Sequence, residues 1–370
     1  MKPAAGLVTV LLAVEFLDEL LYGAREAAWP QVRQALGLSY LQVGTALALP
    51  RVVSLLVEPP LGVLADRGHR RRIVVWGGIA LALGAAALAG AGSFLVFLAA
   101  LAVLDPASGA FVSLSQATLM DSSPAERERN MVRWTLAGGV GAAGGPLLLA
   151  VGASWRGVFA FCSVLAACAV PAIRRHRLDG AREGEGSRGV WAALRQRDVL
   201  RWLVLLELQG LGSEALLGFL ALYLVDVTGT SPRAAALAVL AWTGAGLAGN
   251  LVLVRALARV GGLRWLRISA VAVAITFPGF QLAPGLVPKL VAVSAIGALV
   301  VGWYPISQAR LYDALPGRSG TAAAAATVAS VLGIVLPLAL GALAGQVGLG
   351  NALWLCLLAP LALLVGVPRR

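Results

Sequence analysis

Twelve apolar segments follow one another along the chain, separated by short polar stretches. They lie near residues 7–30, 40–64, 73–91, 94–119, 131–152, 155–173, 202–226, 232–254, 267–283, 286–309, 320–345 and 350–367. A helix of roughly 20 apolar residues crosses the hydrocarbon core of a bilayer. The one long polar segment, residues 174–201, follows the sixth. We therefore expect two six-helix bundles, residues 1–173 and 202–370, joined by this cytoplasmic linker.

The composition agrees with a membrane setting. Hydrophobic residues make up 59% of the chain and charged residues 13%, whereas soluble domains are about 25% charged. The mean hydropathy is +0.83. The chain is therefore predicted to be an all-α membrane protein with twelve transmembrane helices in contact with the lipid bilayer.

The net charge of +12 is explained by topology. If the amino terminus is cytoplasmic, 24 of the 30 basic residues fall in cytoplasmic segments, where Lys and Arg near span ends are retained. The others are Arg25, Arg33, Arg156, Arg233 and Lys289 outside and Arg51 within a span. We expect a multi-pass protein of the cell inner membrane with both termini cytoplasmic, and no nucleic-acid partner.

The two halves repeat one another. Glu15 and Ser39 are 24 residues apart, and so are Glu207 and Ser231, which sets the second half at an offset of 192. Halves repeated about an axis along the membrane normal are a transporter architecture, with the substrate site near mid-membrane between them.

The segment "GVLADRGHRRR" resembles the loop between the second and third helices of the major facilitator superfamily. The residues in register are Gly62, Asp66, Arg67, Arg71 and Arg72. His69 stands at the second glycine position and Gly68 comes one residue early, so the turn is expected to be altered.

This resemblance implies a pseudo-symmetric twelve-helix fold, transport by alternating access and no cofactor. It also implies that Asp66 lies at the amino-terminal end of the eleventh helix, where Ser319 is a candidate cap. The alternative is that the arginines only retain the loop in the cytoplasm.

A second resemblance lies in the fifth helix. Gly141, Gly145 and Pro146 fit the core of a pattern found in exporters of the superfamily, although these glycines equally permit close helix packing. Exporters of this kind carry an arginine in the fourth helix, where this chain has Asp105, with Gly109 in register.

The first helix carries a polar stripe. Its members are Glu15, Asp18, Glu19, Tyr22 and Glu26, and they fall within an arc of about 100 degrees. The seventh helix has Glu207 and Glu214 seven residues apart, and the second has Arg51 and Glu58 at the same spacing.

These charges lie in spans that line the cavity in the resembled family. A charge at mid-bilayer costs at least about 2.5 kcal/mol, so each needs a partner or a use. Seven carboxylates face one arginine, Arg51, whose charge partner is Glu58. Desolvation and like-charge repulsion favour protonation of some of them. A purely structural network is the alternative, and it is the preferred interpretation for Glu26.

The sequence therefore predicts a proton-coupled secondary transporter, an exporter of a small lipophilic or cationic compound. The proton-coupling candidates are Glu15, Asp18, Glu19, Asp105, Glu207 and Glu214, and the substrate-cavity candidates are Tyr22, Gln116, Asn250, Trp303, Tyr304 and Gln308. The alternative is an uptake symporter for a small nutrient or metal cation. We expect a monomer and no enzyme or metal site, because no nucleophile is set beside a base and His69 and His176 are far apart.

Overall fold

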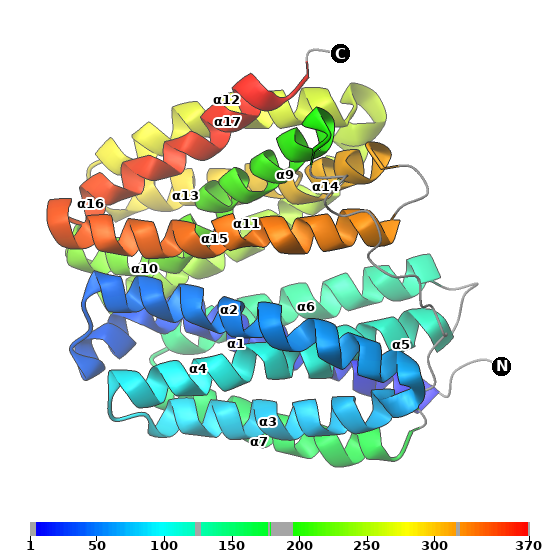
Figure 1. Cartoon of the computed structure of the whole chain (residues 1–370). Helices are drawn as coiled ribbons and strands as arrows, with labels where there is room; N and C mark the ends of the chain where they lie inside the picture. The colour runs from blue at the N-terminus through cyan, green and yellow to red at the C-terminus, as the bar shows by residue number, and fades with distance from the viewer. Residues whose placement is uncertain (1–4, 123–126, 177, 179–194, 316–318, 369–370) are drawn as a thin grey trace. The chain divides into compact units, whose positions relative to one another are not determined.

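The computed structural model describes residues 5–122, 127–176, 178, 195–315 and 319–368, and the regular secondary structure in these ranges is helical. The chain divides into two compact units. The N-terminal unit contains Met1–Gln42 and Ala46–Gly184, and the C-terminal unit contains Val43–Thr45 and Glu185–Arg370. Within each unit, long helices lie side by side (Figure 1). Most of the predicted linker falls outside the described residues.

The N-terminal unit has six helical rods within its described residues. They are α1 (Ala5–Leu36), α2 (Tyr40–Leu64), α3 (Arg70–Gly90), α4 (Phe94–Ser108) continued by α5 (Leu114–Ser122), α6 (Arg127–Ala150) and α7 (Trp155–Arg174). A π-helical turn, η2 (Gly109–Ser113), joins α4 to α5. The first rod runs past Pro30 and ends before Gly37, whose φ of 64° suits the end of a helix.

The described part of the C-terminal unit repeats this count. Its rods are α9 (Arg197–Gly210) with α10 (Leu216–Asp226), α11 (Pro232–Val260), α12 (Gly262–Leu282), α13 (Leu286–Val300) with α14 (Trp303–Asp313), α15 (Ser319–Val347), and α16 (Leu349–Ala352) with α17 (Leu358–Gly366). A second π-helical turn, η4 (Leu211–Ala215), interrupts the first of these rods, and a short 3₁₀ turn, η5 (Leu353–Leu357), the last.

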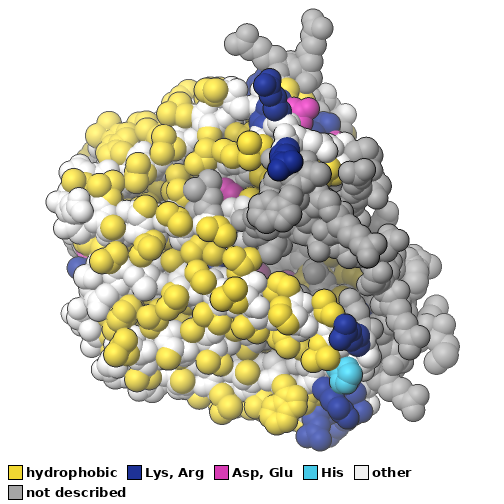
Figure 2. Space-filling view, viewed as in Figure 1, with side chains coloured by type: hydrophobic (Ala, Val, Ile, Leu, Met, Phe, Trp, Pro, Cys, Tyr) yellow, Lys and Arg dark blue, Asp and Glu magenta, His cyan; other side chains and the backbone are white. Residues whose placement is uncertain are grey.

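The surface of the rods is suited to lipid. Ten of the described helices are long and apolar enough to cross a membrane, and large side chains such as Leu95 are exposed on them. On the face seen in Figure 2, hydrophobic side chains cover the sides of the rods, and most Lys and Arg side chains lie near one end. The two less apolar rods are α1, which carries the carboxylates, and the glycine-rich α6.

The sequence repeat corresponds to a structural repeat. Ser39 caps α2 by accepting a hydrogen bond from the Gln42 N–H at 3.2 Å, and Ser231 caps α11 by accepting one from the Ala234 N–H at 3.2 Å. Each cap satisfies a backbone donor that has no partner inside its helix. Residues 192 positions apart thus start the second rod of each unit.

The glycines of α6 bring it close to α1. A Cβ at Gly141 or Gly145 would collide with the α1 backbone, and a Cβ at Gly23 would collide with the carbonyl of Ala142 on α6. That carbonyl is four residues before Pro146, which has no N–H to offer it. The two backbones approach closely because at each contact one of the two helices has a glycine, which carries no side chain.

Gly145→Ala should lower the free energy of unfolding by about 2 kcal/mol, because the added methyl group has only backbone to displace. Gly144→Ala is the matched control, since its Cβ would meet only the flexible end of Leu20. Thermal unfolding of both purified variants in detergent measures the difference. Equal midpoints would contradict the close contact.

Candidate functional site

The carboxylates of α1 lie against the backbone of α6. Glu15 is buried, and Asp18 and Glu19 are half-buried. A Cβ placed on Gly138 would meet Glu15 Oε1 at 2.5 Å and Glu19 Cγ at 3.3 Å. Glycine at this position therefore leaves room for two acidic side chains between the helices.

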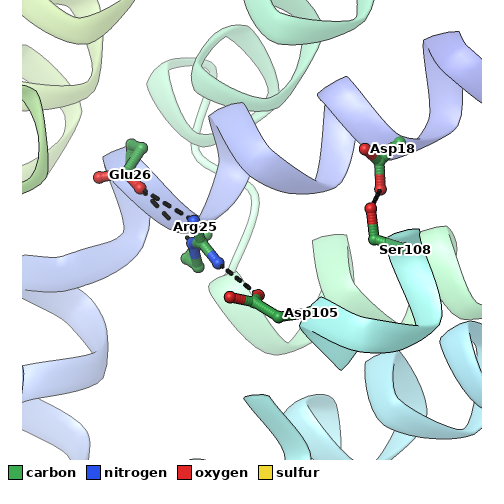
Figure 3. A network of polar contacts seen from close by, with 5 residues as sticks. All are labelled: Asp18, Arg25, Glu26, Asp105 and Ser108. Atoms are coloured by element: carbon green, nitrogen blue, oxygen red, sulfur yellow. Dashed lines mark hydrogen bonds and ion pairs between the residues drawn. The ribbon is translucent and has the colours of Figure 1, made fainter. Parts of the chain in front are cut away.

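A second contact connects the stripe with α4 (Figure 3). Ser108, the last residue of α4, donates a hydrogen bond from its hydroxyl to Asp18 Oδ1 at 2.7 Å. The π-helical turn η2 begins at the next residue, and such turns often occur at functional sites. Asp18 is thus held by a neutral group that is both a donor and an acceptor.

Arg25 forms the charged centre of the same network. Its Nη1 lies 3.1 Å from Asp105 Oδ1, and its Nε lies 3.4 Å from Glu26 Oε1. Its guanidinium also lies 5.1 Å from the centre of the Tyr22 ring. Figure 3 shows Arg25 between the two carboxylates, with α1 and α4 joined through it. Glu26 is 2% exposed, so this ion pair is shielded from water.

Arg25 corrects one prediction. The distribution of basic residues predicts that Arg25 lies in an outer segment and that Arg51 is the cation within the spans. In the structure, Arg25 lies inside α1 and pairs with Asp105. The available signal was its spacing, because a residue seven positions after Asp18 shares its helix face.

The predicted pair on α2 is more open. Arg51 is half-buried and makes contacts of its own. The Glu58 carboxyl lies against Gly109 in η2, where a Cβ would collide with it. Glu58 therefore joins α2 to the same part of the fourth rod.

The predicted carboxylates of the C-terminal unit are separate from one another. Glu207 on α9 accepts a hydrogen bond from the Gly333 N–H of α15 at 2.9 Å. Glu214 lies in η4 and is exposed. Between them, the Gln209 side-chain oxygen accepts a hydrogen bond from the Ser307 hydroxyl at 3.2 Å, a contact that the sequence analysis did not identify.

The six cavity candidates differ in exposure. Asn250 and Tyr304 are exposed, and Tyr22, Gln116 and Gln308 are half-buried. Gln116 Nε2 lies 3.8 Å from the sulfur of Met131 on α6. Trp303 departs from the prediction: it is 1% exposed, and its indole N–H donates to Ser269 Oγ of α12 at 2.9 Å. We therefore omit it from the proposed cavity.

The loop after α2 turns at Gly68. Its φ of 91° is a left-handed conformation that favours glycine, so the displaced glycine makes the turn one residue early. Arg71 donates to the carbonyl of Arg174 at the end of α7 at 2.5 Å. Basic side chains near helix C-termini satisfy such carbonyls, so this loop residue fixes the sixth rod of its own unit.

The structure describes only some of the other residues predicted for this loop. Arg67 and Arg72 are exposed, and Gly62 has no neighbouring atom within 4 Å of an added Cβ. The side chains of Asp66 and Ser319 lie outside the described part of the structure. Among the described residues, no group of three or more His, Cys, Asp or Glu side chains is arranged to hold a metal ion.

Comparison with models of known families identifies one family. The model of the Major Facilitator Superfamily matches residues 11–337. The nucleoside transporter NupG has a TM-score of 0.79 at 14% identity, covering 98% of this chain and 97% of that chain. A D-xylose-proton symporter has a TM-score of 0.76 at 14% identity, and the match covers 98% of this chain and 98% of that chain.

A third solved structure is a bacterial homolog of the human lysosomal transporter Spinster, inward-facing and occupied. Its TM-score is 0.75 at 14% identity, covering 97% of this chain and 93% of that chain. At these identities the structural likeness shows the fold alone. No curated protein matches the sequence.

Removing the guanidinium tests the ion pair. Arg25→Gln should cost about 3 kcal/mol of stability, because it takes the guanidinium away from Asp105 and Glu26 in a shielded position. The double variant Arg25→Gln/Asp105→Asn should recover part of this loss. Chemical unfolding of the two single variants and the double variant gives the coupling energy.

Arg201→Gln is the control, because the Arg201–Asp198 pair on α9 is exposed and such pairs contribute at most about 1 kcal/mol. A loss for Arg25→Gln no larger than for this control would contradict the assigned role of Arg25.

Proposed function

The chain belongs to the major facilitator superfamily, and on that premise we propose that it exports small lipophilic or cationic compounds in exchange for protons. It is a membrane transporter of the secondary class, works by alternating access and is not an enzyme. The twelve described rods fit the predicted fold class, in two units of six. To this class of transporter the proposal adds the coupling ion, the direction of transport and the class of substrate.

The contact between Asp18 and Ser108 carries the proposal. An ionised Asp18 accepts a hydrogen bond from the Ser108 hydroxyl, which is the contact seen in the structure. A protonated Asp18 can instead donate to the same oxygen, because a hydroxyl group is both donor and acceptor. This position therefore accommodates both protonation states with little rearrangement.

Asp105 is suited to a different role. Its partner is a guanidinium, which stays protonated and offers only donors. Protonating Asp105 would break the pair and leave a shielded cation. Asp105 was predicted as a proton-coupling residue, and we now propose that it is the charge partner of Arg25.

Glu15 and Glu19 complete the proposed proton site. Within the described residues, neither has an ion pair, and both lie one turn or less from Asp18 on the same face of α1. Three neighbouring carboxylates repel one another when all are ionised, so a bound proton or a cationic substrate relieves the same repulsion. Competition between the two is the physical basis of exchange.

The remaining features of the proposal follow the sequence. Both termini are cytoplasmic in the inner membrane, because the basic residues gather on that side. The transporter acts as a monomer, and the loop containing Asp66 and Arg71 controls opening on the inside. Tyr22, Gln116, Asn250, Tyr304 and Gln308 are the proposed substrate contacts, and Glu214 is a further carboxylate for protons.

Asp18→Asn should abolish proton-driven transport of tetraphenylphosphonium in proteoliposomes, because the amide keeps the hydrogen bond to Ser108 but carries no exchangeable charge. Its melting temperature should stay within about 3 °C of the wild type. Asp198→Asn, at an exposed position on α9, is the control. Wild-type transport by Asp18→Asn would remove Asp18 from the coupling mechanism.

Flux under an imposed pH gradient distinguishes export from uptake. In vesicles loaded with tetraphenylphosphonium, an inward proton gradient should drive the cation outward, because the two compete for the acidic site. An uptake symporter would move its substrate inward with the protons. Inward movement of a sugar or nucleoside probe coupled to protons would favour the alternative function.

A further inference from the structure

Glu207 is bound by the backbone of a neighbouring membrane helix. Its Oε2 accepts a hydrogen bond from the Gly333 N–H at 2.9 Å, and a Cβ at Gly333 would collide with the carboxylate. A carboxylate bound to a backbone N–H makes a charge-assisted hydrogen bond, about twice as strong as a neutral one. Gly333 therefore provides both the donor and the space for this contact.

The backbone of α15 lacks a helical hydrogen bond at the same residue. In an α-helix, the carbonyl of Gly333 would accept from the N–H of residue 337, but that residue is Pro337. Kinks in membrane helices arise at Pro, at Gly and where a side chain enters the helical hydrogen-bond ladder. All three conditions meet within one turn of α15.

Among the described helices that pack most against α9, few ionisable residues are present. Neither α15 nor α17, both packed against α9, contains an ionisable residue. On α14, Arg310 is paired with Asp313 at 3.2 Å, and two tyrosines, 304 and 312, complete its titratable groups. On the rod of Glu207 itself, Arg197, Asp198 and Arg201 lie at the opening turns of α9 and Glu214 lies in η4.

A related contact occurs in the N-terminal unit, where the fifth-rod glycine is three residues out of register with Gly333. Glu15 and Glu207 are 192 residues apart, the offset that also relates the caps of α2 and α11. Each lies on the first rod of its unit and against a glycine of the fifth, Gly138 or Gly333. Fifth-rod prolines, Pro146 and Pro337, follow both glycines.

We propose that Gly333 is a positioning residue for Glu207, holding its ionised carboxylate on the α15 backbone, and that protonation of Glu207 releases α15 to bend between Gly333 and Pro337. The inference rests on the proposed function, since proton coupling gives the release its use. It adds a proton-controlled bend in the eleventh rod to the proton site of the first.

Hydrogen exchange tests the release without a substrate. Exchange of amides in residues 329–345 is compared at about pH 8 and about pH 5.5, each corrected for the intrinsic rate. Wild-type protein should exchange at least about tenfold faster at the lower pH, because the charge-assisted bond is lost. Glu207→Gln should exchange at the faster rate at both values, since its amide remains neutral.

Gly333→Ala should behave like Glu207→Gln, because its methyl group displaces the carboxylate. Gly345→Ala is the matched control, since it lies on the same helix with open space around its Cβ, and it should retain the wild-type pH dependence. Identical pH dependence in the wild type and Glu207→Gln would overturn the proposal.

Transport assays separate this proposal from the function on which it rests. If wild-type proteoliposomes move no tetraphenylphosphonium under any pH gradient, the proposed exporter function fails, while the exchange data still decide the release of α15. If transport is proton-driven and Glu207→Gln leaves both its rate and pH profile unchanged, Glu207 has no part in coupling and the proposal fails alone.

Discussion

A charged group inside a membrane-spanning helix must have a partner or lose its charge, and this constraint governs the arrangement of the N-terminal unit. The helix that carries most of the charge, α1, packs on α6, whose glycines leave space for acidic side chains between the two backbones. The remaining charge is neutralised across the helix pair, where Arg25 on α1 lies between Glu26 and Asp105. Close packing and charge pairing therefore depend on the same face of α1.

The two kinds of partner explain why neighbouring carboxylates can have different roles. The partner of Asp105 is a guanidinium, which offers only donors, whereas the partner of Asp18 is the Ser108 hydroxyl, which can donate or accept. The fourth rod carries Asp105, and the cation that pairs with it comes from α1. In the proposed mechanism, the Arg25–Asp105 ion pair keeps its charges, and the neighbouring Asp18 is the group whose charge changes when it binds a proton.

The spacing of residues predicted the helices and their repeat, but it did not predict features that depend on contacts between helices. Twelve apolar runs, the stripe of α1 and the 192-residue offset all follow from spacing, and the caps at Ser39 and Ser231 occupy matching positions. Arg25 was missed because basic residues were sorted by side of the membrane rather than by helix face. The roles of Gly138 and Gly333 have no sequence signal, because a glycine that admits a carboxylate looks like any other small residue. Trp303 was misplaced because aromatic residues serve in cores as well as cavities.

In the proposed mechanism, the repeated carboxylates Glu15 and Glu207 take two different roles from one position of the repeat. Glu15 shares its helix face with Asp18 and Glu19, so its charge is felt by neighbours of the same sign. Glu207 has its nearest acidic neighbour on the same rod two turns away, and it accepts a hydrogen bond from a peptide N–H. Like-charge repulsion favours binding of a cation, while a backbone donor favours ionisation and ties it to helix shape. One position of the repeat can thus select what is bound in one unit and respond to protonation in the other.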